Sequence, residues 1–257
     1  MPTALITGAA HGLGACMAEH AAHGLGACMA EHAARHGYRV GVLDLDLEEA
    51  RAVADPIGGV ALAADVTEPD QVEDAVERLG ETPKLLINNA GILRTGPLID
   101  HAVEDFSKVV QVNLVSVFIV SQIVARRMKD NGGGAIVNLA SINAIHPATL
   151  CGAYPAAKAG VVGLTQQMSL EWGRYGIRVN AMAPGFIDAG MGKPFYRNPA
   201  IRELRGNAVP LGGIGSADDV AECAMFLASD AAAYISGQNI AIDGGVINSV
   251  LMQLPRE

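Results

Sequence analysis

The fold is decided by a stretch near the start of the chain, Thr7-Gly8-Ala9-Ala10-His11-Gly12-Leu13-Gly14. It follows an apolar run at residues 4–6 and precedes a helical pattern. Glycines at such a strand-to-helix turn allow tight curvature and let backbone N–H groups approach a phosphate at the helix N-terminus. A glycine triplet alone is weak evidence, and a tight turn without a ligand is the alternative; its position favours a dinucleotide site. The residues assigned to this site are Gly8, His11, Gly12, Leu13 and Gly14.

Outward from this turn, short apolar runs alternate with helical periodicity almost to the end of the chain. The expected strands are residues 4–6, 39–45, 60–63, 84–88, 135–139, 178–181 and 239–242. The expected helices include residues 71–79, 109–128, 156–172 and 218–228. This alternation predicts an α/β fold, a doubly wound parallel sheet of about seven strands with helices on both faces. Because no linker or composition break is visible, residues 1–257 are expected to form a single domain.

Composition narrows the possible partners. The chain has 257 residues, a formal net charge of −9 at pH 7 and no run of basic residues, which disfavours nucleic acid and anionic membranes. No leader is expected, and no apolar stretch reaches the roughly 18–20 residues that span a bilayer. The four cysteines, Cys16, Cys28, Cys151 and Cys223, lack CxxC spacing. This pattern predicts reduced thiols in a cytoplasmic protein, with no metal site.

One anomaly falls at the glycine turn. Residues 9–20 read AAHGLGACMAEH, and residues 21–32 repeat that string letter for letter. One continuous helix is not expected, because the apolar face of the second copy would lie about 120° out of phase with the first. In the favoured arrangement the first copy forms the phosphate loop, and its helix runs to about His23 with Gly24 just past its end. In the alternative the first copy bulges out, and Gly24 and Gly26 serve the phosphates.

Asp44, which ends the second expected strand and precedes Leu45, bears on cofactor choice. A carboxylate there can accept hydrogen bonds from ribose hydroxyls and would repel a 2′-phosphate, which favours NAD over NADP. A solvated charge at a strand end is the structural alternative. His11 is at most weakly cationic at pH 7, so NADP stays open as the less favoured cofactor.

Three polar residues in the second half of the chain suggest acid–base chemistry. Tyr154 and Lys158 lie one helical turn apart, so both project from the same face. A nearby ammonium is expected to lower the pKa of the tyrosine, ordinarily about 10, and make it an acid/base near neutral pH. Ser141 follows an expected strand, where it can donate a hydrogen bond to a substrate oxygen. A surface pair on an amphipathic helix is the structural alternative for Tyr154 and Lys158.

Together these residues resemble the short-chain dehydrogenase/reductase family, over nearly the whole chain once twelve residues are discounted. Seven landmarks follow one another in the family's order. They are the TGxxxGxG-like turn at 7–14, Asp65-Val66, the NNAG string at 88–91, Asn113, Ser141 with YPAAK at 154–158, Pro184-Gly185, and DGG at 243–245.

The resemblance implies hydride transfer between a nicotinamide and a secondary alcohol or ketone. Tyr154 would exchange the proton, Ser141 would hold the substrate oxygen, and Lys158 would tune Tyr154 and hold the nicotinamide ribose. Asn113 would anchor a water that relays protons to Lys158. The resemblance also implies a homotetramer or dimer, with helices 109–128 and 156–172 as interface candidates. The implied cofactor contacts are Asp65, Val66, Asn89, Ala90, Gly91, Tyr154, Lys158, Pro184, Gly185 and Ile187.

The sequence also departs from the family pattern. The family often has a threonine shortly after Pro-Gly, but Ala189 stands there, which leaves Ile187 as the expected nicotinamide contact. Residues 190–207 are polar and irregular and follow a strand end, where a lid or a plain pair of connecting helices would fit. His146 and Cys151 lack metal-ligand spacing and are expected to line the substrate pocket or to pack in a loop.

Two other functions compete with this interpretation. An NADPH-dependent 3-ketoacyl-thioester reductase would use the same machinery. A non-catalytic scaffold or partner subunit would result if the repeat had disrupted the phosphate loop, although the intact Ser141, Tyr154 and Lys158 argue against it. The sequence does not determine which alcohol or ketone is the substrate.

Overall fold

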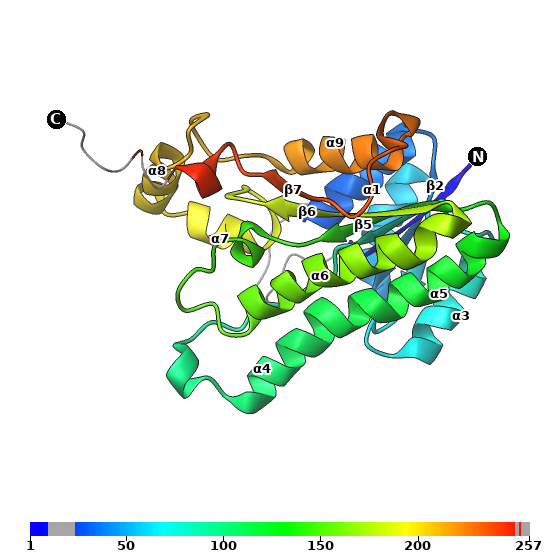
Figure 1. Ribbon diagram of the computed structural model, residues 1–257, viewed down its shortest axis with the longest axis horizontal. Coiled ribbons are helices and arrows are strands. Elements are labelled where there is room, and N and C mark those ends of the chain that lie inside the picture. Colours follow the sequence, from blue (N-terminus) through cyan, green and yellow to red (C-terminus); the bar gives the residue numbers. More distant parts are fainter. Residues whose placement is uncertain (10–23, 250–251, 253–257) are drawn as a thin grey trace.

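The computed structural model describes residues 1–9, 24–249 and 252. In that part of the chain it forms one α/β domain around a seven-stranded sheet in the order β3-β2-β1-β4-β5-β6-β7 (Figure 1). Every neighbouring pair of strands is parallel, which confirms the predicted fold class. The strands are β1 (Thr3–Thr7), β2 (Arg39–Asp44), β3 (Val60–Ala63), β4 (Leu85–Asn88), β5 (Gly134–Leu139), β6 (Ile177–Pro184) and β7 (Asn239–Ile242).

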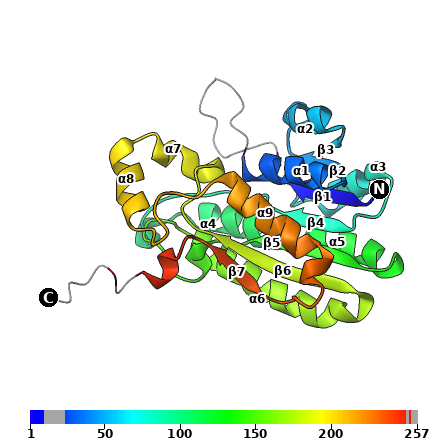
Figure 2. The same ribbon diagram turned by 90° about the horizontal axis from the view of Figure 1, so that it is seen from above.

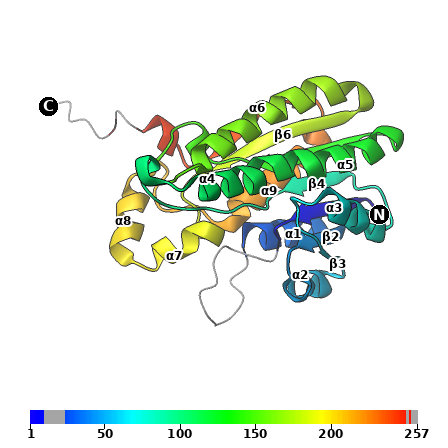
Figure 3. The same ribbon diagram turned by 90° about the horizontal axis from the view of Figure 1, so that it is seen from below.

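Helices cover both faces of the sheet. One face carries α1 (Leu25–Arg35), α2 (Leu47–Ala54) and α9 (Ala217–Ala228), as Figure 2 shows from above. The opposite face carries α3 (Pro69–Leu79), α5 (Ser116–Asp130) and α6 (Tyr154–Trp172), seen from below in Figure 3. Three shorter helices, α4 (Val103–Val110), α7 (Lys193–Tyr196) and α8 (Pro199–Asn207), lie toward the carboxyl end of the sheet (Figure 1).

The strands are apolar on both faces because both faces are covered. All five residues of β1 and all four of β4 are buried. The polar exceptions pair with one another: Asn88 Nδ2 donates to Ser121 Oγ and to Asn138 Oδ1, each at 2.8 Å, and Asn138 Nδ2 donates to Thr165 Oγ1 at 2.9 Å. These bonds join β4 and β5 to α5 and α6. Asn88 therefore has a structural role beneath the site.

The helix from Val103 to Asp130 is longer than the predicted 109–128. It runs through α4, a π-helical turn at Gln111–Val115 and α5, and by length and composition it could cross a membrane. The prediction that no stretch is long and apolar enough is therefore wrong for this helix. Half of its most apolar stretch is buried, and α5 packs on β4, β5 and α3. It is a core helix of the domain.

The helix α1 begins inside the second copy of the repeat. Gly24 is its N-cap, with φ −68° and ψ 173°, and the helix runs to Arg35. The predicted helix that ends at about His23 lies outside the described residues. Apolar residues of the second copy, Ala27, Met29 and Ala30, are buried in the core, and this packing places the helix. His11, Gly12, Leu13 and Gly14 lie outside the described residues.

Gly26 lets α1 approach the end of β1 closely. A Cβ atom built on Gly26 would lie 2.6 Å from Ala9 Cα, 2.7 Å from Gly8 O and 2.7 Å from Asn89 Nδ2. Real Cβ atoms do not approach backbone that closely, so this position requires glycine. The glycine that packs α1 against the sheet therefore belongs to the second copy.

Two helices, α2 and α4, were not predicted. They have eight residues each, too few for a clear period. Residues 190–207 form α7 and α8 after a short 3₁₀ turn at Gly190–Gly192, which agrees with the alternative of connecting helices.

A pair of matched glycine substitutions tests which copy packs against the sheet. Gly26→Ala should destabilise the fold by about 1–3 kcal/mol, because the added methyl group meets backbone on two sides. Gly14→Ala, the same change in the first copy, should leave stability nearly unchanged. Urea unfolding followed by circular dichroism measures both variants; equal losses, or a larger loss for Gly14→Ala, would contradict the assignment.

Candidate active site

A cavity of about 550 Å³ opens at the carboxyl ends of the strands, beside the switch point where the chain passes from β3 back to β4. Ligands of doubly wound folds bind at this place, and the volume is ordinary for a ligand pocket. Eight residues predicted from the sequence to contact the cofactor line it: Gly8, Asp44, Leu45, Asp65, Val66, Asn89, Ala90 and Gly91.

Gly8 forms the floor where β1 and β4 meet. Its φ of +61° favours glycine, and a Cβ there would lie 2.6 Å from Ala90 Cα. Asn89 Nδ2 donates to the carbonyls of Thr7 at 3.1 Å and Gly8 at 2.7 Å, while Thr7 Oγ1 accepts from the backbone N–H groups of Asn89 and Ala90. These contacts hold the start of the loop after β4 against the end of β1.

The side of the cavity at β2 and β3 is acidic. Asp44 is 5% exposed, and its Oδ1 accepts from Leu45 N at 2.7 Å. Asp46 and Asp65 line the same side, with Lys108 as a cation in the lining. Burial alone would raise the pKa of Asp65, but hydrogen bonds from Thr67 and the charge of Lys108 lower it overall. Three carboxylates therefore surround this part of the cavity.

The N-terminus of α1 faces the cavity at Leu25, a residue of the second copy. The N-cap residue is Gly24, which has no side chain that could accept a hydrogen bond from the first N–H groups of the helix. Such a helix start presents backbone N–H groups and the positive end of the helix dipole to an anion. The sequence prediction gave Leu25 no role, because the identical Leu13 was available in an intact motif.

Asn113 connects the cavity to the interior. It lies fully buried in the π-helical turn, where its Oδ1 accepts from Ile92 N at 2.7 Å and its Nδ2 donates to Ile92 O at 2.8 Å. A Cβ on Gly91 would lie 3.4 Å from Asn113 Oδ1 and 3.7 Å from Lys158 Nζ. Gly91 and Ile92 line the cavity, so Asn113 and Lys158 stand directly behind its wall.

Tyr154, Lys158 and Ser141 form one group, in which Lys158 and Ser141 are buried and Tyr154 is half-buried. Tyr154 is the first residue of α6, and Lys158 follows one turn later with its Nζ 5.7 Å from the tyrosine ring centroid. Lys158 Nζ donates to Leu139 O at 2.6 Å, at the end of β5. Ser141 hydrogen-bonds Tyr154, and its Oγ accepts from Asn143 N at 3.2 Å. A phenol, an ammonium and a hydroxyl therefore converge where β5 ends.

Burial governs the protonation of this group. It raises the pKa of Tyr154 to about 12, against the lowering effect of the hydrogen bond with Ser141, and it lowers the pKa of Lys158 to about 8. The expected lowering of the tyrosine pKa by Lys158 is therefore wrong for this structure. The lysine directs its ammonium at the Leu139 carbonyl, and loss of hydration outweighs its attraction for a phenolate.

Comparisons with known proteins identify the family. Residues 8–247 match the family model described as Enoyl-(Acyl carrier protein) reductase, which groups short-chain dehydrogenases. The D-threitol dehydrogenase of Mycolicibacterium smegmatis is 37% identical over 250 residues, covering 94% of this chain and 91% of the relative. The NAD-dependent glycerol dehydrogenase of Listeria innocua serovar 6a is 36% identical over 247 residues, covering 94% and 92%.

A solved structure agrees with these relatives. The gluconate 5-dehydrogenase of Burkholderia cenocepacia J2315, in complex with NADP and tartrate, superposes with a TM-score of 0.87 at 31% identity, covering 97% of this chain and 96% of that one. This chain belongs to the short-chain dehydrogenase/reductase family. It is an oxidoreductase that transfers hydride between a nicotinamide cofactor and a CH–OH group.

The predicted contacts after β6 lie outside the cavity lining of this short-chain dehydrogenase. Gly185 lets the chain pass close to β7, because a Cβ there would lie 2.6 Å from Asp243 Cβ. Ile187 is buried and pairs with Gly215 in an isolated bridge. On this side, Gly190 and Met191 line the cavity instead.

Arg205 is a residue of the dehydrogenase that sequence reasoning missed. From α8 its guanidinium lies 5.1–5.6 Å from the ring centroids of Phe186, Phe195 and Tyr196. Its charge also reaches Cys151, where it opposes the rise in thiol pKa caused by burial. Arg205 therefore fixes α7 and α8 beside the loop that leads to Tyr154. The sequence gave no signal for Arg205, because the three aromatic residues come close to it only in the folded chain.

The pKa of Lys158 predicts a pH effect on stability. Between its folded value of about 8 and its ordinary value of 10.5, the unfolded chain binds more protons, so the free energy of unfolding should rise with pH. Relative to Lys158→Met, the wild type should gain stability above about pH 8, by at most about 1.4 kcal/mol per pH unit. Urea unfolding at pH 7 to 9.5 measures the difference; a pH-independent difference would contradict the burial of a charged lysine.

Proposed function

We propose that this enzyme is an NAD-dependent dehydrogenase of a polyol or sugar acid, oxidising a secondary hydroxyl group and reducing the matching ketone in reverse. The observation that carries the proposal is the group of Tyr154, Lys158 and Ser141 behind a cavity of about 550 Å³ that Asp44, Asp46 and Asp65 line. The names of the relatives, D-threitol, glycerol and gluconate dehydrogenases, support the substrate class.

The residues divide the chemistry among them. Ser141 holds the substrate oxygen, and Tyr154, protonated at neutral pH, donates its proton to a carbonyl or accepts one from an alcohol at a higher pH. Lys158 lies one turn away, where its ammonium can hold a ribose hydroxyl of the cofactor. Asn113, behind Gly91, supports a proton relay. The nicotinamide, when bound, supplies or accepts the hydride.

The cofactor fits the cavity as follows. Asp44 and Leu45 contact the adenosine ribose, Asp65 and Val66 the adenine, and Asn89, Ala90 and Gly91 the centre of the dinucleotide. Pro184, Gly185 and Ile187 hold the nicotinamide end. Gly24, Leu25 and Gly26 at the start of α1 bind the phosphates, in the role predicted for the first copy. The two copies of the repeat arose by a tandem duplication.

NAD is favoured because a 2′-phosphate would lie among Asp44, Asp46 and Asp65. A homo-oligomer is proposed through α5 and α6, which expose Phe118 and Leu170. The chain acts as one catalytic domain in the cytoplasm. A 3-ketoacyl-thioester reductase is the second candidate, favoured by the acyl-carrier-protein description of the family model.

The Tyr154→Phe variant tests the catalytic assignment. Removal of the hydroxyl group should lower kcat for polyol oxidation about 10²–10⁴-fold, because the proton has no acceptor. The Kd for NADH, measured by the cofactor's fluorescence, should change less than about twofold. Tyr175→Phe, at the far end of α6, is the matched control. A Tyr154→Phe variant that turns over substrate as fast as the wild type would contradict the role of Tyr154 as acid/base. A wild-type protein that does not bind NADH would favour the alternative of a non-catalytic scaffold.

Cofactor preference tests Asp44. The wild type should prefer NAD to NADP, and the double change Asp44→Ser with Leu45→Arg should shift the ratio of kcat/KM values toward NADP by about 100-fold. That shift corresponds to about 2.7 kcal/mol, the order expected for replacing a repelling carboxylate with a pairing guanidinium. Glu48→Gln, an exposed change outside the cavity, should leave the ratio unchanged. An NADP preference in the wild type, with 3-ketoacyl-thioester turnover, would support the second candidate.

A further inference from the structure

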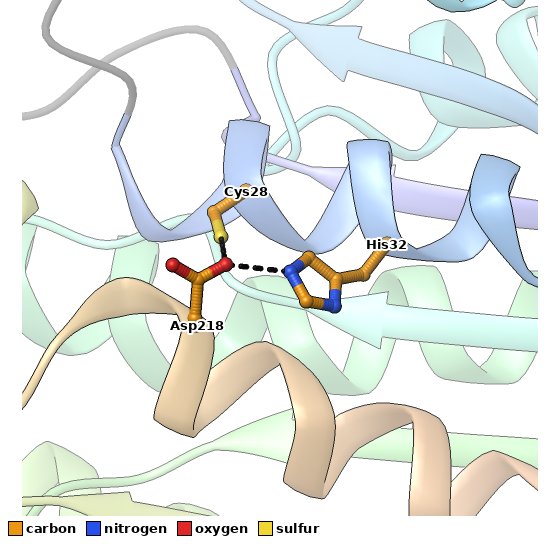
Figure 4. Close-up of side chains that lie close together, drawn as sticks. All are labelled: Cys28, His32 and Asp218. Carbon is orange, nitrogen blue, oxygen red and sulfur yellow. Dashed lines mark hydrogen bonds and ion pairs between the residues drawn. The ribbon is translucent and has the colours of Figure 1, made fainter.

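Two pairs of side chains face each other between α1 and α9, away from the cofactor cavity. Cys28 and His32 lie four residues apart on α1, and Asp218 and Glu222 lie four residues apart on α9, so each pair shares one helix face. Figure 4 shows Cys28, His32 and Asp218 directed at one another from the two helices. The four side chains include the thiol, imidazole and carboxylate groups that bind transition metals.

The distances suit a small ion. Cys28 Sγ lies 3.6 Å from Asp218 Oδ1, His32 Nε2 lies 2.7 Å from the same oxygen, and the three ligand atoms all lie within 4.8 Å of one another. Tetrahedral zinc, with bonds of about 2.0–2.3 Å, separates its ligand atoms by about 3.3–3.6 Å. Asp218 would have to withdraw from His32 by less than about 1 Å. Its side chain is 70% exposed, so it has room to move.

The imidazole is already oriented for coordination. The His32 side chain is 4% exposed, and its Nδ1 lies 3.2 Å from Glu222 Oε1. A carboxylate on the far nitrogen of a ligating histidine fixes its ring orientation and leaves the other nitrogen for the metal. Asp218 and Glu222 add two negative charges, against the charge of Arg35, which acts on Asp218. The site therefore has a partner for each histidine nitrogen and an excess of negative charge.

We propose that Cys28 Sγ, His32 Nε2 and a carboxylate oxygen of Asp218 bind a divalent transition metal of the zinc class, with water completing a tetrahedral shell. Glu222 holds His32 Nδ1–H. On binding, the Cys28 thiol releases its proton to solvent as the sulfur–metal bond forms, and the proton of neutral His32 resides on Nδ1.

The ion would join α1 to α9 close to the cofactor site. Cys28 follows Leu25, the cavity-lining residue at the start of α1, by three residues, or nearly one helical turn. Metal binding would therefore stabilise α1 in the position where Leu25 lines the cavity. The proposal stands independently of the substrate class and of the cofactor preference.

The first copy carries the same Cys-x₃-His pattern, at Cys16 and His20, and provides an internal control. The proposal assigns affinity to the second copy because its side chains meet Asp218. Cys16→Ser with His20→Gln should therefore leave metal binding unchanged. Cys223→Ser controls for loss of a partly buried thiol on α9 itself.

The test is a titration of the purified full-length protein with Zn²⁺ against a chromophoric chelator, and a parallel titration with Co²⁺. We expect one ion per chain and a near-ultraviolet thiolate-to-cobalt absorption band. Cys28→Ser should abolish the band and, like His32→Gln, weaken Zn²⁺ binding at least about 100-fold. Asp218→Asn, a change at an exposed carboxylate that keeps the fold, should weaken it similarly. Glu222→Gln should weaken it about 10-fold, as changes to groups that orient a ligand do.

Thermal unfolding gives a second measurement. Zn²⁺ should raise the Tm of the wild type and of the Cys16→Ser/His20→Gln control, and should leave the Tm of Asp218→Asn unchanged. The proposal is overturned if the wild type binds no Zn²⁺ below about millimolar concentration. It is equally overturned if Cys28→Ser and Asp218→Asn bind the ion as the wild type does. In either case the cluster would be a hydrogen-bonded link between two helices.

Discussion

The structure depends on close backbone approach where β1, β4 and α1 meet. Gly8 adopts a positive φ and lies against Ala90, while Gly26 brings α1 within van der Waals distance of Ala9 and Asn89. A side chain at either glycine would push the helix or the strand outward. This contact sets where α1 begins, and it thereby opens the cavity between the helix start and the acidic ends of β2 and β3.

The catalytic group depends on a different feature, the burial of polar atoms behind the cavity. Lys158 is held by the Leu139 carbonyl, and Asn113 by both backbone groups of Ile92. These partners lie at the end of β5 and in the loop after β4, so both polar side chains can remain in the interior. The same burial raises the pKa of Tyr154 and lowers that of Lys158, which makes proton exchange sensitive to any charge that enters the cavity.

The position of α1 links the two halves of the molecule. Its first turn faces the cavity, while Cys28 and His32 face Asp218 and Glu222 on α9. A ligand bound at the α1–α9 contact would therefore lie fewer than two helical turns from the start of α1. The copy of the repeat that begins α1 packs against both the sheet and α9.

The sequence by itself determined the strand-and-helix alternation, the parallel sheet and half of the cavity lining. Gly8 and Asp44 were predicted because buried strands and glycine turns leave local patterns, and Asn89–Gly91 were predicted from the resemblance to the family. Only the tertiary structure shows that the second copy begins α1 and packs against the sheet, since the two strings are identical. The pKa of Tyr154, the place of Arg205 among aromatic rings and the meeting of Cys28 with Asp218, 190 residues away, also depend on burial and on contacts between distant segments.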